Sequence, residues 1–346
     1  MYVKKNFGVI NILKFTGAPL LFLAGWAMIV YVGHVIWHDA WVDISWLPIS
    51  VIGTAVAFYV GFKNNQAYDR LWEARKIWGA IVNDSRTWGS MVKAYVSNLF
   101  AEKEQASSEE LRGEVQVLVY RHMAWLYALR SQLLIPTSWE HISQGRLGRH
   151  NTKRRMKNFG VGLVDDHDTE AILQDLIPEE EYDTLINYKN TATQLIARQG
   201  MHLKELREKG LIDDFRHMEP HNLLKGFYTH QGKAERIKKF PLPRQYGNSS
   251  QIFVSIFLFL LPFGMITEFH KLGEDAAWLS IPFSCLVGWV FIMMELVGDY
   301  SENPFEGLGN DIPMLALCRT IEIDLREMLG EEDLPPGIRP VNGVLM

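Results

Sequence analysis

Long runs without a charged residue interrupt the sequence at four places. Asp, Glu, Lys and Arg are absent from residues 15–33, 44–62, 245–267 and 276–294. A helix that crosses the hydrocarbon of a bilayer needs roughly 20 apolar residues. The runs therefore predict four membrane spans, over about 15–35, 44–66, 245–267 and 276–298. The alternative, a buried helix of a soluble core, applies best to the second and fourth runs, which are short and contain Pro48 and Pro282.

The polar sequence between the second and third runs carries helical patterns. The second span continues past Phe62 to Ser90 or beyond without a break signal. Further helices are predicted over about 109–134, from Pro178, over about 190–209 and over about 222–239. No stretch alternates in the manner of a strand. We therefore expect an all-α membrane protein with four transmembrane helices. An all-α cytoplasmic region would cover about 67–244 and 299–346, within one domain over 1–346.

The positions of Lys and Arg predict the orientation in the membrane. The N-terminal arm carries Lys4, Lys5 and Lys14, whereas the loop after the first span has Asp39 and Asp43 and no cation. Further cations flank the second and third spans: Lys63, Arg70, Lys238, Lys239 and Arg244. Because Lys and Arg near span ends stay on the cytoplasmic side, we expect both termini and the large polar region in the cytoplasm. The protein would be a multi-pass protein of the cell (inner) membrane.

Composition adds little to this picture. The net charge of −5 gives no basic footprint for a nucleic acid, and the two cysteines make no disulfide framework. The basic stretch 144–158 is either a solvated loop or a contact for anionic lipids. At the inner end of the fourth span, Glu295 and Asp299 are expected to pair with Lys or Arg nearby, unlike the buried charges that pumps need.

Three segments resemble one family in residues, order and spacing. The first is Pro48-Ile49-Ser50, then Gly61-Phe62-Lys63-Asn64-Asn65-Gln66-Ala67-Tyr68-Asp69-Arg70 and Glu73-Ala74-Arg75. The second is Glu235-Arg236-Ile237, then Pro241-Leu242-Pro243 and Tyr246. The third is Asn303-Pro304-Phe305, Asn310-Asp311-Ile312-Pro313 and Ile321-Glu322-Ile323-Asp324-Leu325. Together they resemble the bestrophin family, especially its bacterial members, over about 15–329. The resemblance implies a pentameric channel whose single central pore is lined by the second span of each subunit.

Thr54, Phe58 and Phe62 are spaced i, i+4 and i+8, so they share one face of the second span. Small residues that permit close helix approach lie among them: Gly53, Ala55, Ala57 and Gly61. The resemblance implies that the three residues form the pore neck, an apolar constriction that gates by dewetting. The alternative is that both phenylalanines pack against lipid or another helix. Thr54 departs from the family, which tends to carry an aliphatic residue there, and its hydroxyl would ease wetting.

The resemblance also implies a second constriction, made at the cytoplasmic exit by one side chain just after a Gly-containing turn. That position falls on Phe215, after Gly210. The alternative is that Phe215 anchors a helix start in the core. Asp213 and Asp214 are candidates to line the exit, where they would favour cations. The alternative is that they serve as N-caps of the following helix.

A calcium site is another property of the family, in animal members. There an acidic run after Asn-Pro-Phe clasps calcium against the N-terminus. Here Asn303 and Asp311 remain from that pattern, but Leu308 stands where an acid would be expected. Calcium needs six to eight oxygen ligands, and both remaining residues are also compatible with helix capping. We therefore expect no metal site, with these two residues as its remnant.

Ion selectivity stays open at this point. The edges of the neck rings are electropositive and favour anions, whereas Asp213 and Asp214 favour cations. The preferred hypothesis is a channel for monovalent ions that conducts anions such as chloride. The alternative is a sodium-selective channel of the same fold.

A membrane-bound enzyme and a scaffold without conduction are the rival interpretations. His217 and His221 have i, i+4 spacing, and residues 165–168 read Asp-Asp-His-Asp. However, no carboxylate base lies between the two histidines, and Pro220 disturbs a helix there. The sequence also has no Gly-rich phosphate loop. We therefore expect no enzyme activity and no cofactor, and we expect copies of the same chain, membrane lipids and permeating monovalent ions as partners.

Overall fold

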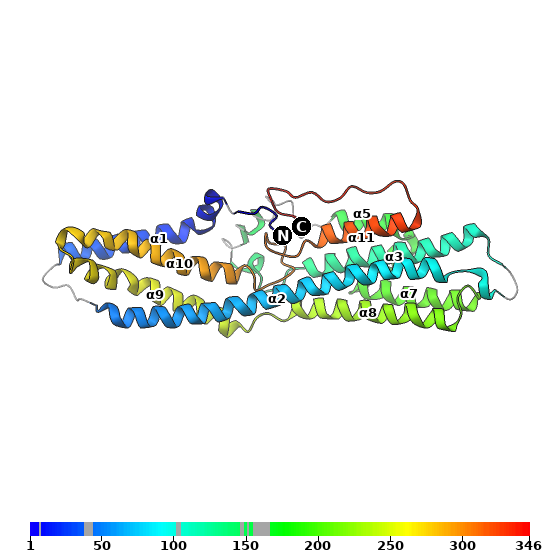
Figure 1. Cartoon of the computed structure of the whole chain (residues 1–346), viewed down its shortest axis with the longest axis horizontal. Helices are drawn as coiled ribbons and strands as arrows, with labels where there is room; N and C mark the ends of the chain where they lie inside the picture. The colour runs from blue at the N-terminus through cyan, green and yellow to red at the C-terminus, as the bar shows by residue number, and fades with distance from the viewer. Residues whose placement is uncertain (7, 38–43, 102–104, 146–148, 151, 155–166) are drawn as a thin grey trace. The chain divides into compact units, whose positions relative to one another are not determined.

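The computed structural model describes residues 1–6, 8–37, 44–101, 105–145, 149–150, 152–154 and 167–346. Across these ranges every regular element is a helix, and β-type pairing is limited to isolated bridges such as Tyr2 with Val344. The all-helical prediction is therefore confirmed for this part of the chain. The helices, drawn in Figure 1, belong to two compact units. One domain over 1–346 stays a prediction.

The first unit, here called the membrane unit, comprises Lys4–Arg70 and Pro241–Asn303. It contains α1 (Val9–Ile36), the first half of α2 (Trp46–Tyr95), α9 (Arg244–His270), the 3-10 helix η4 (Glu274–Leu279) and α10 (Ser280–Asp299). Four helical segments are long and apolar enough to cross a membrane: Phe15–Ile36, Trp46–Tyr95, Arg244–His270 and Glu274–Asp299. All four predicted spans are thus helices. α2 extends beyond its span and contributes its second half to the other unit.

Pro48 and Pro282, which favoured the soluble-core alternative for the second and fourth runs, lie at positions where helices accept proline. Pro48 is the third residue of α2, and Pro282 is the third residue of α10. The first N–H groups of a helix have no partner within it, so the missing donor of a proline costs little there. These prolines mark where the two helices begin.

Small residues bring α10 close to α1 in the membrane unit. A Cβ added at Gly288 of α10 would lie 2.2 Å from a methyl of Leu23, so any larger residue there would require the Leu23 side chain to move. On α1, the indole of Trp26 stacks on Phe259 of α9, with ring centroids 4.8 Å apart, and donates to the Phe259 carbonyl at 2.9 Å. These contacts pack α1 against both α9 and α10.

The second unit, here called the polar unit, comprises Met1–Val3, Leu71–Phe240 and Pro304–Met346. Besides the second half of α2, its helices are η2 (Asn98–Phe100), α3 (Ser108–Leu134), η3 (His141–Ser143), α5 (His167–Leu176), α6 (Glu179–Leu185), α7 (Thr191–Glu208), α8 (Asp214–Lys239) and α11 (Met314–Leu329). The core is rich in aromatic side chains, and the largest fully buried ones are Trp78, Trp88, Trp125, Tyr127, Phe227 and Phe305.

Cap residues account for the helix ends that were predicted correctly from the sequence. Ser107 and Glu110 form a capping box at the start of α3, and Asn190 accepts from the Thr193 N–H at the start of α7. The helix predicted over about 222–239 corresponds to α8, and its predicted start near residue 222 is wrong. α8 begins at Asp214 and includes Pro220, because Asp213 caps it by accepting from the Arg216 N–H. α5 and α11 were not among the predicted helices.

Candidate functional site

α2 has two contrasting sides within the membrane unit. Its buried side recurs every three or four residues and includes Ile49, Gly53, Val56, Val60, Lys63 and Ala67. The opposite side carries Thr54, Phe58 and Phe62, and the two phenylalanines are 67% and 70% exposed. The expected common face of these residues is therefore present. Neither phenylalanine packs into the core of its own chain, which leaves lipid or another subunit as the partner of this face.

The small residues of α2 differ in what they meet. A Cβ added at Gly53 would lie 2.7 Å from the ring of Phe257, so this glycine permits close packing of α2 on α9. A Cβ added at Gly61 would meet nothing within 4 Å. Close approach within the chain therefore involves Gly53 and leaves the surroundings of Gly61 open.

Thr54 presents less polarity than its residue type indicates. Its hydroxyl donates to the carbonyl of Ser50, one turn earlier, at 2.9 Å. The hydroxyl hydrogen is therefore engaged inside the helix, and only the oxygen lone pairs remain for water. The expected easing of wetting at this end of the neck is correspondingly reduced.

A buried polar cluster lies on the other side of α2. Lys63 forms an ion pair with Glu295 of α10 at 2.5 Å, with side chains 2% and 13% exposed. Ser250 of α9 donates its hydroxyl to the second carboxylate oxygen of Glu295. Asn64 donates to the Met294 carbonyl at 2.9 Å. We call Lys63, Asn64, Ser250 and Glu295 the anchor cluster.

The expected pairing of Glu295 with a nearby cation is thus confirmed, and its partner is Lys63. From the sequence alone, Lys63 was a cation at the end of a span with no assigned partner. The buried positions of α2 carry a signal that was missed, because the periodicity of Val56 and Val60 continues through Lys63 to Ala67. A charged residue in register with a buried apolar stripe indicates a specific partner.

Phe215 lies in the first turn of α8 and is 80% exposed. This exposure excludes the alternative that it anchors the helix in the core of its own chain. The turn before it depends on Gly210, whose φ of 72° favours glycine. Arg216 holds the start of the helix, because its guanidinium donates to the Ser97 hydroxyl at 3.2 Å and lies 5.0 Å from the ring centroid of Phe100.

The two acidic residues beside Phe215 are engaged locally. Asp213 is the N-cap of α8 and accepts from the Arg216 N–H at 2.8 Å, as one of the alternatives had it. Asp214 is paired with Arg207 of α7, and this hydrogen bond lowers the pKa of the Asp214 carboxyl. Its charge is therefore matched by a neighbouring cation, which weakens the case for a cation-attracting acidic ring.

The loop with the calcium-clasp remnant is closed by internal hydrogen bonds. The Asp311 carboxylate accepts from the N–H groups of Phe305, Gly307 and Ile312 at 2.9, 2.8 and 2.7 Å. Burial raises the pKa of this carboxyl. With both oxygens engaged and Leu308 buried where an acid would be needed, Asp311 does not fit a calcium ligand. Asn303, also buried, belongs to the membrane unit.

Two basic side chains complete this part of the polar unit, the buried Lys238 and the half-buried His141. The Lys238 ammonium lies 2.5 Å from Glu140 and donates to the Phe305 carbonyl at 3.1 Å. The His141 imidazole lies 2.9 Å from the carboxylate of Glu306. The carboxylates around the loop thus have protein partners. In the described part of the chain, no three His, Cys, Asp or Glu side chains come together to hold a metal ion.

The rival chemical sites gain little support. The rings of His217 and His221 lie 5.8 Å apart on α8. Their expected shared face is present, but among the described residues no third His, Cys, Asp or Glu side chain joins them to hold a metal ion. Asp165 and Asp166 lie outside the described residues, as do Arg146, Arg155 and Lys157 of the basic stretch.

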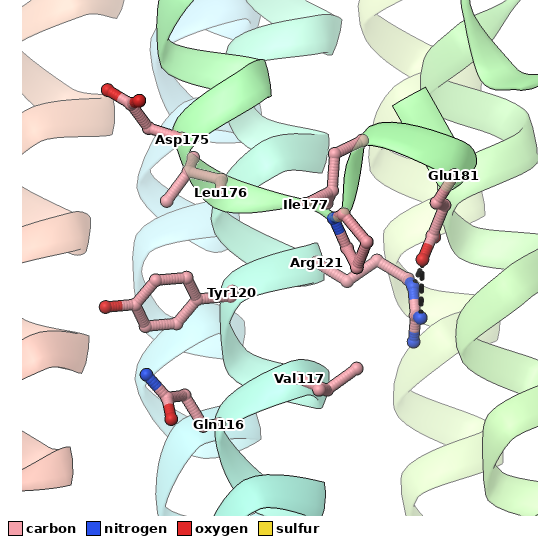
Figure 2. Close-up of a pocket in the computed structure, with 9 residues that line it drawn as sticks. Gln116, Val117, Tyr120, Arg121, Asp175, Leu176, Ile177 and Glu181 are labelled. Atoms are coloured by element: carbon pink, nitrogen blue, oxygen red, sulfur yellow. Dashed lines mark hydrogen bonds and ion pairs between the residues drawn. The ribbon is translucent and has the colours of Figure 1, made fainter. Parts of the chain in front are cut away.

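A cavity of about 300 Å³ opens in the polar unit between α3 and the junction of α5 and α6 (Figure 2). Its wall includes Arg121 and Glu181, which form a two-bond ion pair at 2.6 and 2.8 Å. Arg121 also contacts Nδ1 of His202 at 3.1 Å. These charged groups are satisfied by one another, and the lining residues include no Ser, Thr, Cys or His to act as nucleophile or base. The wall carries two carboxylates, Asp175 and Glu181, and the second of them is held by Arg121.

The chain is similar to known proteins over most of its length. A family model described as "Bacterial/Fungal Bestrophin protein" matches residues 10–327. A voltage-dependent anion channel-forming protein of Ralstonia nicotianae is 28% identical and covers 91% of this chain and 88% of that relative. The voltage-dependent anion channel-forming protein YneE of Escherichia coli K12 is 25% identical and covers 85% of this chain and 80% of that relative.

The fold is also that of solved structures. The crystal structure of a bacterial bestrophin homologue from Klebsiella pneumoniae matches with a TM-score of 0.72 at 23% identity, covering 91% of this chain and 98% of that chain. The apolar helices and this shared fold make the protein a membrane protein. Since the family model spans well over half of the sequence, the chain belongs to the bestrophin family.

Proposed function

We propose that this protein is one subunit of a homopentameric channel that conducts monovalent anions such as chloride through a central pore. The first half of α2 lines the pore in the membrane, and Thr54, Phe58 and Phe62 form its neck. The observation that carries the proposal is the exposed stripe of α2, which points away from the core of its own chain. The names of the curated relatives, which are anion channel-forming proteins, support the choice of ion.

The neck is an apolar gate in this proposal. Five copies of Phe58 and Phe62 would surround the axis with aromatic side chains that cannot replace the hydration shell of an ion. A narrow apolar constriction of this kind favours the dry, non-conducting state. When the neck opens, the ring edges present partial positive charge to a passing anion.

Phe215 is the second constriction in this proposal. Its exposure leaves the side chain available to narrow the exit. The acidic neighbours do not favour cations strongly, because Asp213 caps α8 and Asp214 is paired with Arg207. Anion conduction is therefore favoured over the sodium-selective alternative.

We propose that the protein lies in the cell (inner) membrane with both termini in the cytoplasm. The two terminal segments pair with each other, since the Val3 N–H donates to the Gly343 carbonyl at 2.9 Å. This pairing supports a common side of the membrane for both termini, as an even number of spans requires. The Lys and Arg residues near the span ends favour the cytoplasm as the side on which both termini lie. Enzyme activity is not part of this proposal, and the permeating ions and membrane lipids are the small-molecule partners.

The proposal is tested with purified protein in liposomes under an about tenfold KCl gradient. Anion conduction gives a reversal potential near the chloride equilibrium value, about 59 mV from zero, and the current persists when the cation is large and impermeant. A reversal potential of the opposite sign would establish the sodium alternative. Absence of flux would support a scaffold. Native mass in mild detergent should equal five times the 39.8 kDa of one chain, and a monomer or dimer would contradict the pore.

A further inference from the structure

We infer that the anchor cluster sets the rotation of α2 and thereby the direction in which the neck phenylalanines point. This inference rests on the proposed channel function. It assigns Lys63, Ser250 and Glu295 as positioning residues for the gate, acting through Phe58 and Phe62.

The first observation is the convergence of three helices on one carboxylate. Glu295 of α10 has its Oε1 at 2.5 Å from the Lys63 ammonium of α2, and its Oε2 accepts from the Ser250 hydroxyl of α9. Lys63 and Ser250 are 3% and 0% exposed. Hydrogen bonds and ion pairs need defined distances and angles. The carboxylate therefore fixes α2 relative to both neighbours at this level.

The second observation is that the next residue of α2 fixes the same stretch of α10. The Asn64 side chain donates to the Met294 carbonyl and lies against Gly298, where an added Cβ would come within 1.9 Å of the Asn64 Oδ1. Two consecutive residues of α2 thus contact positions 294, 295 and 298 of α10. A pair of adjacent contacts resists rotation about the helix axis better than one contact does.

The third observation concerns the rest of the buried side. On the N-terminal side of Lys63, α2 packs on α9 through Gly53, Val56 and Val60, and the partners on α9 are Val254 and Phe257. Apolar contacts are non-directional, so they hold the helix against α9 without specifying its rotation closely. Buried ion pairs add little net stability but can specify one arrangement among several. The charged contacts therefore define the rotation of α2 about its axis, which the apolar contacts do not define.

The neck lies directly beside this cluster in the sequence. Phe62 precedes Lys63, and Phe58 lies one turn earlier on the same side as Phe62. A side chain reaches about 5–6 Å from the helix axis, so a rotation of α2 by about 20° would move a ring by about 2 Å. A shift of that size is comparable with the bore of a dewetted pore. Loss of the anchor cluster should therefore disorder the apolar collar and raise basal flux.

The main test variant is Lys63→Met combined with Glu295→Leu. It removes the contacts that converge on the Glu295 carboxylate, keeps the Asn64 hydrogen bond, and leaves no buried charge unpaired, which is often tolerated. Ser250→Ala is the milder variant and keeps the ion pair. The matched control is Lys271→Met with Glu268→Leu, which removes an exposed pair of the same unit at 2.7 Å. Each variant is made in the native channel and in a channel carrying Phe58→Ala and Phe62→Ala, and chloride flux per pentamer is measured in liposomes.

In the native neck, we expect the main variant to raise basal flux at least fivefold, Ser250→Ala to raise it by a smaller factor, and the control pair to leave it within twofold. In the alanine neck, the main variant should change flux less than twofold, because the cluster acts through the phenyl groups. A structural role alone would change assembly or the melting temperature equally in both backgrounds.

Two results would overturn the inference. One is a basal flux that is unchanged from the native channel in both the main variant and Ser250→Ala. The other is an equal change in both neck backgrounds. If the main variant does not assemble, Ser250→Ala decides by the same comparison. Failure of the proposed function is distinguishable, because it would appear as absent flux in the parent protein or as an alanine neck that conducts like the native one.

Discussion

Replacement of both neck phenylalanines by alanine is the most direct test of the gate. Phe→Ala costs about 3–5 kcal/mol when the ring is fully buried. Phe58 and Phe62 are 67% and 70% exposed within one chain, so about a third of each ring is buried. Scaling by that fraction gives about 1–1.5 kcal/mol for each ring. The double variant should therefore lose about 2–3 kcal/mol per subunit, a loss that most domains tolerate.

The effect on conduction should be larger than the effect on stability. In the proposed pentamer, the double substitution would remove ten phenyl groups from the collar, which would widen the bore and remove apolar surface at once. Both changes favour water in the neck. A tenfold rise in basal flux needs a decrease of only about 1.4 kcal/mol in the barrier. We therefore expect at least a tenfold rise, without the normal stimulus for opening.

The assay is chloride efflux from liposomes that contain equal amounts of pentamer, with assembly checked by native mass. The control is Phe22→Ala, since Phe22 is 79% exposed but lies on α1 of the same unit. This control should conduct as the native channel does. A stable, pentameric double variant with unchanged basal flux would refute the neck assignment. A double variant that falls apart would show that the two rings pack between subunits instead of gating.

Three further predictions follow from the polar unit. Phe215→Ala should raise single-channel conductance at least twofold without changing native mass, whereas Phe240→Ala, also at an exposed site, should leave it unchanged. Calcium chelation should leave flux within twofold, because Asp311 uses both carboxylate oxygens on backbone N–H groups; a larger loss in recordings with a calcium chelator would contradict this. Burial lowers the pKa of His122 from 6.5 to about 3. Between these values the unfolded chain binds more protons at this site than the native one does. Stability should therefore fall by about 1.4 kcal/mol per pH unit as the pH decreases through this window. Melting curves at pH 7 and 5 should show this decrease, and it should be smaller in His122→Gln.

The sequence predicted the spans and several helix ends because their causes are local. The length of an uncharged run decides whether a helix can cross a bilayer. Asn190 caps α7 through a bond three residues away, which is visible in the sequence. α8 shows the limit of local signals. Pro220 suggested a break, but the cap at Asp213 and the contacts of Arg216 with Tyr95, Ser97 and Phe100 hold a helix that includes the proline.

The anchor cluster was not predictable in the same way. Lys63 and Glu295 are 232 residues apart in the sequence, and each alone is an ordinary charge at the end of a span. The positive-inside pattern used Lys63 as a flanking cation, which concerns its side of the membrane and not its partner. Only the packing of α2, α9 and α10 places the ammonium beside the carboxylate.

The neck raises a different difficulty, because exposure in one chain does not identify what covers a face. Phe22 on α1 and Phe58 on α2 are similarly exposed. Both side chains are apolar, so polarity alone does not decide whether each faces lipid or a pore. The contacts on the opposite side of each helix differ. α1 is held by apolar packing, such as Leu23 against Gly288, and by neutral hydrogen bonds from Trp26 to the Phe259 carbonyl and from Trp289 to Thr16. α2 carries a buried ion pair instead, between Lys63 and Glu295 of α10, and the same carboxylate accepts from Ser250 of α9. A buried ion pair adds little net stability but can specify one arrangement of a helix, and a gate depends on such a defined arrangement of its side chains. The buried charges of α2 therefore favour the pore as the partner of Phe58 and Phe62.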